Sequence, residues 1–325
     1  MMIRFAREND IDRIMNFIEI YWKKGHILAN NKDFFKYEHL LEEGVTYVIS
    51  ENEGGEINAI LGYIPYGKHD RDVMTVMWKA NHTAESSLGL KLFKFLMDNG
   101  DIRVIASPGS NPKLKGLYGY LGYHFGKMTQ WYRLQDKNKY SIAKITNPEI
   151  PDVKNAVTYM VISSWNDVEE NFDFEHYGKN IKPYKEDWYI KKRYFEHPIY
   201  DYIVYGVKGY YNKVSLLMFF RVINVKGQKA IRLVDCIGDI SVLSQVSNVI
   251  DDILIKYDAE YVDCYETGLP DSVMCMAGWK KTEGSGNIIP NYFEPFVQEN
   301  IDIYYFSSDA DVILFKADGD QDRPS

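Results

Sequence analysis

The residue best placed for acid–base chemistry in this chain is Tyr118, in the stretch NPKLKGLYGYLGYHFGKM at residues 111–128. A phenol can donate a proton to a leaving group, or it can be an ordinary core side chain. Apolar residues around Tyr118 recur every three to four positions, which predicts one buried helical stripe: Leu114, Leu117 and Leu121. Gly122 stands where a helix ends in the left-handed conformation, and an aromatic residue then begins the next strand.

This spacing resembles that of the GNAT-type acyl-CoA N-acyltransferases. In that family an Asn after the fifth strand is followed seven residues later by a Tyr, and a Leu-Gly-aromatic triplet ends the helix. Here these positions hold Asn111, Tyr118, Leu121, Gly122 and Tyr123. The resemblance implies transfer of an acyl group from acetyl-CoA, or another acyl-CoA, to an amine. It also implies that Tyr118 is the general acid to the CoA thiolate and that Asn111 belongs to the cofactor site.

A degenerate copy of the stretch lies in the second half, at TGLPDSVMCMAGWKKTEG. Gly278 and Trp279 keep the end of the helix, but Met274 stands where the tyrosine would be. Because a methionine cannot donate a proton, the copy predicts a tandem fold with the chemistry in the first half only.

The loop at residues 84–89 is the predicted binding site for the CoA pyrophosphate. Unsatisfied N–H groups and the helix dipole favour an anion at a helix N-terminus. The family supplies these groups with a basic, Gly-rich loop, and the matching residues here are Ser86, Ser87, Leu88 and Gly89. Gly89 matches that loop, whereas the arginine is absent and Glu85 adds a carboxylate. The alternative interpretation is a plain helix start that Ser86 or Ser87 caps.

The attacking amine must lose a proton, and the sequence leaves the base open among His26, His82 and Glu85. His26 lies in WKKGHILANN, between the first two helices, where relatives hold the acceptor, so we expect it to contact substrate. We expect a second acceptor contact in the loop GNIIPNYFEPF, through Asn291 and Tyr292. Flat aromatic faces with amide and carboxylate groups nearby suit carbohydrate recognition. The alternative is a rigid loop that closes the edge of the core.

The C-terminal sequence FKADGDQDRPS places Asp318, Asp320 and Asp322 at alternating positions, like the start of a calcium loop. Arg323 holds the position of the required glycine, and we predict no metal site. Two interpretations stay open. The segment is an acidic tail in solvent, or the strand at 311–318 delivers its carboxylates to a pocket that binds sugar hydroxyls or an amino group.

The composition is that of an ordinary globular protein and argues against several function classes. The 325 residues are 46% hydrophobic and 26% charged, which favours two domains. The net charge of -8, without a Lys/Arg-rich run, argues against nucleic acid or an anionic membrane as partner. No apolar leader or run of ~20 apolar residues is present, so we expect a cytoplasmic protein without membrane insertion. The cysteines lack CxxC spacing and are predicted to be buried and reduced: Cys236, Cys264 and Cys275.

The elements that must position these residues follow a βα order that resembles the GNAT fold over residues 1–136. Predicted strands lie at 2–6, 45–50, 57–66, 72–80 and 102–107, and TQWYRLQ at 129–135 closes the unit. Predicted helices lie at 10–21, 33–41, from Leu88 and from Asn111. The second half repeats the order loosely, with strands at 140–146, 202–208, 214–223, 230–239 and 259–267, a helical region at 187–202 and a helix at 242–253.

Together these patterns predict an α/β (α+β) protein of two tandem GNAT-like domains, with mixed, largely antiparallel sheets flanked by helices. Residues 1–136 are expected to bind acyl-CoA, and residues 140–325 to build the acceptor site or stabilise the assembly. The second half resembles GNAT-like proteins of bacterial surface-polysaccharide biosynthesis, so a nucleotide-linked amino sugar is the first-choice acceptor. Two alternatives are a non-catalytic scaffold that has lost CoA binding and an aminoacyl transferase of the tandem GNAT type. The lack of a basic stripe argues against the latter.

Overall fold

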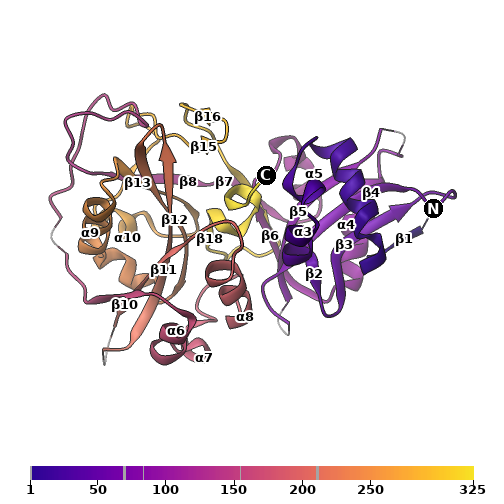
Figure 1. Cartoon of the computed structure of the whole chain (residues 1–325), viewed down its shortest axis with the longest axis horizontal. Coiled ribbons are helices and arrows are strands. Elements are labelled where there is room, and N and C mark those ends of the chain that lie inside the picture. The colour runs from indigo at the N-terminus through magenta and orange to yellow at the C-terminus, as the bar shows by residue number, and fades with distance from the viewer. Residues whose placement is uncertain (1, 69–70, 83, 154, 210–211) are drawn as a thin grey trace. The chain divides into compact units, whose positions relative to one another are not determined.

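The computed structural model describes residues 2–68, 71–82, 84–153, 155–209 and 212–325 (Figure 1). Contacts divide the chain into two compact units. The first unit runs to Ser107 and includes Arg323–Ser325, and the second is Pro108–Asp322. The boundary predicted from the sequence, at residues 136–140, falls within the second unit. Each unit is built on a mixed sheet flanked by helices, which confirms the predicted fold class.

The sheet of the first unit has the strand order β1-β3-β4-β5-β6, and β2 pairs with the start of β3. Its strands are β1 (Met2–Ala6), β2 (Leu40–Leu41), β3 (Gly44–Glu51), β4 (Ile57–Pro65), β5 (Arg71–Ala80) and β6 (Ile102–Pro108). The predicted antiparallel meander is confirmed as β3-β4-β5. Strands β5 and β6 run parallel, because helix α4 carries the chain from the end of one to the start of the other.

The helices of the first unit bury the apolar stripes that the sequence predicts. They are the short η1 (Glu8–Asp10), α1 (Ile11–Phe17), which continues as the π-helix η2 (Ile18–Trp22), α2 (Ile27–Asn30), α3 (Lys32–His39) and α4 (Leu88–Asn99). Ile14 of α1 and Phe35 of α3 pack with Tyr47 of β3 and Ile60 of β4 in one core. The stripe of α4 is likewise buried: Leu88, Leu92, Phe93 and Leu96.

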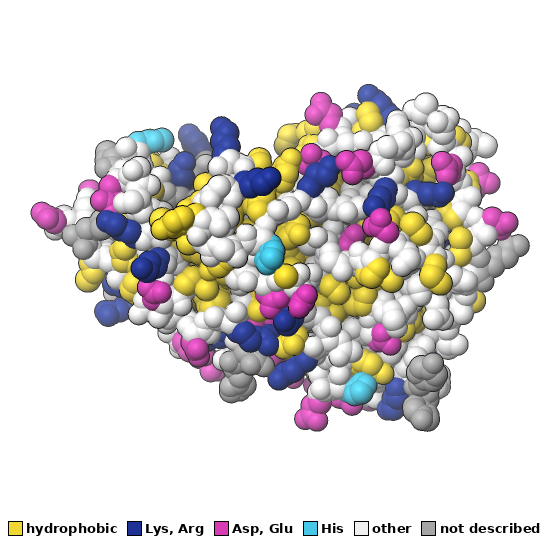
Figure 2. Space-filling view, turned by 180° about the vertical axis from the view of Figure 1, so that it is seen from behind, with side chains coloured by type: hydrophobic (Ala, Val, Ile, Leu, Met, Phe, Trp, Pro, Cys, Tyr) yellow, Lys and Arg dark blue, Asp and Glu magenta, His cyan; other side chains and the backbone are white. Residues whose placement is uncertain are grey.

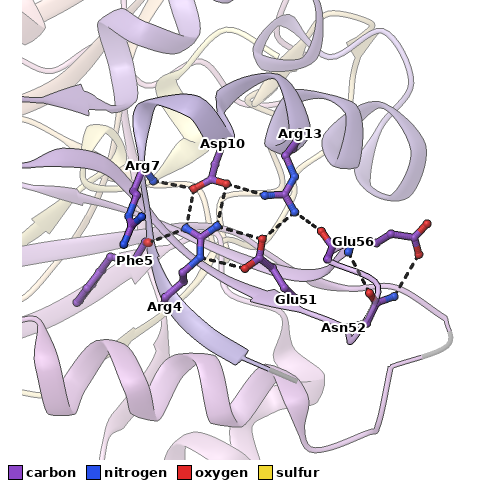
Figure 3. A network of polar contacts seen from close by, with 9 residues as sticks. Arg4, Phe5, Arg7, Asp10, Arg13, Glu51, Asn52 and Glu56 are labelled. Atoms are coloured by element: carbon purple, nitrogen blue, oxygen red, sulfur yellow. Dashed lines mark hydrogen bonds and ion pairs between the residues drawn. The ribbon is translucent and has the colours of Figure 1, made fainter.

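An ion-pair network fixes the start of α1 against the sheet (Figure 3). Arg4 on β1 donates to both oxygens of Asp10, at 2.6 and 2.9 Å, and to both oxygens of Glu51 on β3, at 3.0 Å each. Arg13 pairs with the same two carboxylates at 2.7 and 2.8 Å. Hydrogen bonds from Arg4 lower the pKa of Asp10 and the pKa of Glu51. The network therefore stabilises the folded chain through ionised carboxylates.

Asp10→Asn should make the stability of the protein less dependent on pH. Unfolded Asp and Glu titrate at ~3.9 and ~4.3, so the network contributes fully above about pH 5 and is lost as pH falls through the lower folded pKa values. We expect the variant to lose about 2 kcal/mol at pH 7, and less at pH 3, in urea unfolding. The control is Asp12→Asn, because Asp12 pairs with Lys32 on the surface. A loss that is equal at pH 7 and pH 3 would contradict the prediction.

The sheet of the second unit has the strand order β14-β8-β13-β12-β11-β10-β9, with β18 added to β13. Its strands are β8 (Thr129–Leu134), β9 (Tyr159–Ile162), β10 (Ile203–Lys208), β11 (Val214–Val225), β12 (Gln228–Gly238), β13 (Tyr261–Thr267), β14 (Lys280–Lys281) and β18 (Leu314–Phe315). The same unit contains the pair β7 (His124–Lys127) with β17 (Tyr304–Ser307), and the hairpin β15 (Tyr292–Phe293) with β16 (Phe296–Val297).

The prediction that residues 129–135 close the first unit is wrong. Strand β8 pairs with β13 along its full length, from Thr129 opposite Glu266 to Leu134 opposite Tyr261. Trp131 joins the core of the second unit and is 1% exposed. The alternation of buried side chains predicts a strand, but it does not specify which sheet that strand enters.

The helices of the second unit are mostly short. They are η3 (Pro112–Leu114), α5 (Lys115–Tyr120), α6 (Trp165–Asn171), α7 (Phe174–Tyr177), α8 (Asp187–Ile190), the π-helix η4 (Lys191–Phe195), η6 (Ile240–Gln245), α9 (Ser247–Tyr257), α10 (Asp271–Met276), η7 (Lys316–Asp318) and η8 (Asp320–Asp322). Apolar residues of α9 and α10 pack in one core with β11, β12 and β13. The helical region predicted at 187–202 ends at Phe195.

The predicted strand at 140–146 is a loop, and a buried carboxylate explains why. Glu260 accepts backbone hydrogen bonds from Ser141 at 2.7 Å, Ile142 at 2.8 Å and Ala143 at 3.2 Å. Because these N–H groups converge on one side chain, they cannot alternate along a β-ladder. Only an isolated bridge, between Lys144 and Ile288, is found in this part of the described chain.

Glu260→Gln should destabilise the second unit. The amide keeps the shape of the side chain but loses the charge that strengthens three backbone hydrogen bonds, so we expect a loss of about 2–3 kcal/mol. Urea unfolding at pH 7 measures it, with the exposed Glu299→Gln as a control that leaves stability unchanged. Equal unfolding midpoints for the two variants would show that Glu260 does not organise this loop.

Candidate functional site

The two sequence copies end their helices with the same hydrogen bonds. After α5, the N–H of Tyr123 donates to the carbonyl of Tyr118 at 2.8 Å, and Gly122 has a φ of 76°. After α10, the N–H of Trp279 donates to the carbonyl of Met274 at 3.1 Å, and Gly278 has a φ of 80°. A left-handed glycine closes both helices in this six-to-one pattern. Tyr118 and Met274 therefore occupy equivalent positions.

Tyr118 is a buried tyrosine in an aromatic stack. It is 2% exposed, and its ring lies 4.2 Å from that of Phe306 and 5.8 Å from that of Phe125. Burial raises the pKa of Tyr118 to about 12, partly offset by a hydrogen bond with Ser110. The phenol is therefore protonated at neutral pH. The three leucines of the predicted stripe are only half-buried, so Tyr118 is the main core contact of α5.

The ladder between the two parallel strands of the first unit stops well before the end of β5. Its ladder with β6 ends at Met74 opposite Ala106, whereas β5 continues to Ala80. Beyond that point the Ser107 hydroxyl donates to the Thr75 carbonyl at 2.9 Å. Met77 then takes a left-handed conformation, with a φ of 44°, where the β4–β5 register shifts. The bulge turns the end of β5 away from a regular ladder.

The end of β5 is joined directly to the start of α4. The indole of Trp78 donates to the carbonyl of Gly89 at 3.1 Å and stacks on Phe93 at 5.1 Å. A Cβ at position 89 would lie 3.2 Å from the indole nitrogen, so glycine suits this contact. The predicted pyrophosphate loop thus lies beside the end of β5 that has no ladder with β6, within the first unit.

The N-terminus of α4 has no side-chain cap among the described residues. Ser87 is the N-cap residue, but its hydroxyl donates to the carboxylate of Glu85 at 3.0 Å. Glu85 also pairs with Lys91, and these two contacts, with Lys91 first, lower its pKa. Ser87 therefore holds the N-cap position that the alternative interpretation gives it, but its side chain makes no capping hydrogen bond. Lys91 compensates the negative charge of Glu85 and places a cation at this helix start.

In the second unit the two parallel strands also lose their ladder before they end, and the C-terminal segment occupies the place between them. Strands β12 and β13 pair only from Ile231 to Leu233, although β12 continues to Gly238. There β18 adds to the end of β13, and η7 contacts β12. Lys185 is buried between Asp235 of β12, at 2.6 Å, and Asp318 of η7, at 2.8 Å. The interpretation of the C-terminal segment as an acidic tail in solvent is wrong, because Asp318 is 1% exposed.

The expected acceptor residues Asn291 and Tyr292 differ in burial. Asn291 is buried, and its Oδ1 accepts a hydrogen bond from Lys316. Tyr292 is 43% exposed, and its hydroxyl lies 3.5 Å from Oε1 of Gln321. Lys316 is itself buried, and burial together with Arg232 lowers its pKa well below the ordinary value. Sequence reasoning missed Lys316 and Arg232, because their partners come from distant segments.

The remaining predicted site residues lie on other elements. His26 is the N-cap of α2, where its Nδ1 accepts from the N–H of Leu28 at 3.2 Å. Burial and Lys23 lower the pKa of His26 to about 4, so its imidazole is neutral at pH 7. Asn111 is exposed and caps η3, accepting from the N–H of Lys113 at 3.0 Å. His82 is exposed on the loop after β5.

The cysteines, the possible metal ligands, the helices and the surface charges of the described residues bear on which cofactors and partners the protein can bind. Cys236 and Cys264 are buried as predicted, but Cys275 is exposed on α10, so that part of the prediction is wrong. No group of three His, Cys, Asp or Glu side chains within the described ranges could hold a metal ion. None of the described helices has the length and apolar character to cross a bilayer. On the face in Figure 2, side chains of both charge signs are interspersed.

Comparison with known proteins identifies the fold. No protein-family model matches the chain, and no curated protein matches its sequence. Among solved structures, a GCN5-related N-acetyltransferase from Anabaena variabilis is similar with a TM-score of 0.57 and 12% identity, over 94% of this chain and 72% of that one. A conserved protein of Enterococcus faecalis, described as a "Probable N-Acyltransferase", is similar with a TM-score of 0.58 and 9% identity, over 94% and 71%. The chain therefore has the fold of the GCN5-related N-acyltransferases across most of its length.

Proposed function

We propose that this protein is an acyl-CoA-dependent N-acyltransferase that acetylates an amine on a small molecule. The observation that carries the proposal is the end of β5, which continues to Ala80 after its ladder with β6 stops at Met74, together with the start of α4 beside it, which has no side-chain cap. An extended, amide-bearing ligand can add to a strand end that lacks a ladder partner. A phosphate can bind the helix N-terminus. An acyl-CoA has both parts, a pantetheine arm and a pyrophosphate.

Most of the proposed binding roles fall on residues of the first unit, whereas Asn111 belongs to the second. The pyrophosphate would contact the loop at Ser86 to Gly89 through N–H groups other than that of Leu88, which donates to the Glu85 carbonyl at 3.0 Å. Lys91 would supply positive charge by turning from Glu85 to the phosphate. Asn111 would contribute to the same cofactor, and His26 would contact the acceptor as a neutral hydrogen-bonding group. With a pKa of about 4, His26 is a poor base at neutral pH.

The chemical step requires a new C–N bond and a broken C–S bond. The amine attacks the thioester carbonyl to form the C–N bond and gives up a proton to solvent. The C–S bond then breaks, and the thiolate leaves with help from a hydrogen-bond donor and takes up a proton from solvent. We assign that donor to Tyr118. Because its pKa of about 12 lies above the ~8.5 of a free thiol, Tyr118 would act on the thiolate mainly through its hydrogen bond.

The acceptor that we propose is an amino sugar, nucleotide-linked in the first instance, bound by the second unit through Asn291 and Tyr292. An amide beside an exposed aromatic ring supports this choice, since apolar stacking and paired hydrogen bonds recognise sugars. A cytoplasmic location follows from the need for acetyl-CoA.

Acetyl-CoA should stabilise the protein against heat, by ~2.7 kcal/mol at a hundredfold excess over its dissociation constant. Lys91→Met should weaken binding roughly three- to tenfold, because it removes the cation beside the helix start. Glu85→Gln should tighten binding by a similar factor, because it removes a carboxylate and releases Lys91. Calorimetric titration measures both, with Lys94→Met, an exposed lysine of the same helix, as the control. No binding by the wild-type protein would exclude catalysis and leave the scaffold alternative.

Tyr118→Phe should lower kcat by about a hundredfold or more, the usual effect of losing a hydrogen-bond donor to a charge that develops in the transition state. The phenyl ring keeps the stack with Phe306 and loses only a hydrogen bond, so stability should fall by about 1 kcal/mol. Tyr120→Phe is the matched control, because Tyr120 lies on the same helix and is 83% exposed. Turnover of an amine acceptor with acetyl-CoA gives kcat and KM for both variants. Unchanged kcat in Tyr118→Phe would remove Tyr118 from the acid role.

A further inference from the structure

The second unit contains a group of buried cationic side chains whose charge is only partly balanced. We call it the cationic centre; it consists of the cations Arg193, Arg221, Arg232 and Lys316 and the neutral amide of Asn291, which contacts Lys316. They come from η4, β11, β12, η7 and the loop before β15. Arg193, Arg232, Lys316 and Asn291 are each at most 3% exposed, and the side chain of Arg221 is 15% exposed.

Two carboxylates lie among the four cations within the described part of this unit. Asp322 pairs with Arg221 at 2.7 Å and with Arg193 at 3.1 Å, and the Tyr202 hydroxyl donates to it at 2.9 Å. Asp263 lies 3.4 Å from Nε of Arg232 and accepts from Gln130 at 3.1 Å. Positive charge therefore exceeds negative charge in a place that water reaches poorly. Burial, and then the neighbouring Arg232, lower the pKa of Lys316 well below its ordinary value.

The centre also has buried donors without acceptors. Nothing in the described chain accepts a hydrogen bond from Nδ2 of Asn291, and Nε of Arg232 makes only the long ion pair with Asp263. The amide of Asn291 cannot be turned round to relieve this, because its oxygen already accepts from Lys316. Unpaired buried groups are rare and mark places where a water or a ligand is bound. Here the unpaired atoms are donors, so the missing group must be an acceptor.

The contacts of Asp322 indicate that the missing acceptor is a carboxylate. Its carboxylate is held by two guanidinium groups and a phenol, an arrangement that a second carboxylate could repeat beside Arg232, Lys316 and Asn291. The cover over this part is the hairpin β15–β16. The Phe293 ring lies 4.5 Å from the Arg232 guanidinium, which also donates to the Pro290 carbonyl at 3.2 Å.

We propose that the cationic centre binds the carboxylate of a small-molecule ligand, with Asn291, Arg232 and Lys316 as its contacts and the β15–β16 hairpin as its cover. The inference rests on the proposed function only where it identifies this ligand as the acceptor, which is then an amine that carries a carboxylate. Binding of the carboxylate needs no acyl-CoA. The proposed carboxylate site can therefore be confirmed even if the protein does not transfer acyl groups. It can also be disproved even if the protein does.

The test is calorimetric titration of the full chain, without acetyl-CoA, with D-glucuronate and acetate as carboxylate probes. D-Glucose and inorganic phosphate are the comparison ligands. We expect glucuronate and acetate to bind and glucose not to bind, with affinity that falls as salt rises. Arg232→Gln should weaken carboxylate binding about tenfold or more, and the exposed Glu299→Gln should leave it unchanged.

Asn291→Asp separates binding from folding. The new carboxylate has the shape of the amide and supplies the negative charge that the centre lacks, so the melting temperature should hold or rise while carboxylate binding is lost. Failure of both carboxylates to bind the wild-type protein would overturn the proposal and make the centre purely structural. Binding of phosphate in their place would overturn the ligand class, and undiminished binding to Asn291→Asp would overturn the location.

Discussion

The second unit depends on one buried contact, the ammonium of Lys185 between Asp235 of β12 and Asp318 of η7. Burial alone would lower the pKa of Lys185 and raise that of Asp235, but the opposite charges at 2.6 and 2.8 Å keep the lysine protonated. Tyr194 adds a hydrogen bond to Asp235 at 2.6 Å. Removing one partner of such a set leaves a buried charge unpaired, which commonly costs 3–5 kcal/mol. The contact therefore fixes the C-terminal segment between β12 and β13, and with it the positions of Lys316 and Asp322.

Both units contain a parallel strand pair whose ladder stops early, and they differ in what lies beside the unpaired strand end. Each has a parallel pair joined by a helix, β5–α4–β6 and β12–α9–β13, and each pair loses its ladder before the first strand ends. In the second unit the chain itself supplies β18 and η7 to this place. In the first unit the strand end is shaped by the bulge at Met77 and tied to α4 by Trp78. Since a parallel pair whose ladder stops must satisfy its backbone groups elsewhere, this difference is the physical basis for assigning cofactor binding to the first unit.

Sequence patterns predicted the elements well where side-chain periodicity reports on local burial. The stripe of α4, the meander β3-β4-β5 and the glycine ends of α5 and α10 are all found as the patterns indicate. The predictions failed where a distant partner decides the outcome. Residues 140–146 have the alternation of a strand, but the carboxylate of Glu260 takes their N–H groups. Strand β8 was assigned to the wrong sheet because its partner β13 lies more than a hundred positions further along the chain.

For the candidate sites too, the sequence indicated residues that lie close together in the chain and missed those that come from distant segments. The resemblance to the GNAT family proposed Tyr118, Asn111 and Ser86 to Gly89 as site residues from short stretches of sequence, and it marked Glu85 as an unfavourable charge. It did not identify Lys91 as the partner of Glu85. It also did not find the cationic centre, because Arg193, Arg221, Arg232 and Lys316 come from four separate elements. Each of these groups looks like an ordinary surface charge in the sequence.

By itself, the sequence determined most helices and strands of the first unit and where two of the helices must end, because backbone conformation and apolar periodicity are local properties. Only the tertiary structure decided that the acidic C-terminal segment is buried, which sheet receives β8, and that the place between two parallel strands is filled in one unit by the chain's own end. Those outcomes depend on pairing charges and backbone groups from distant segments. Such pairing is set by the arrangement of the whole chain in space.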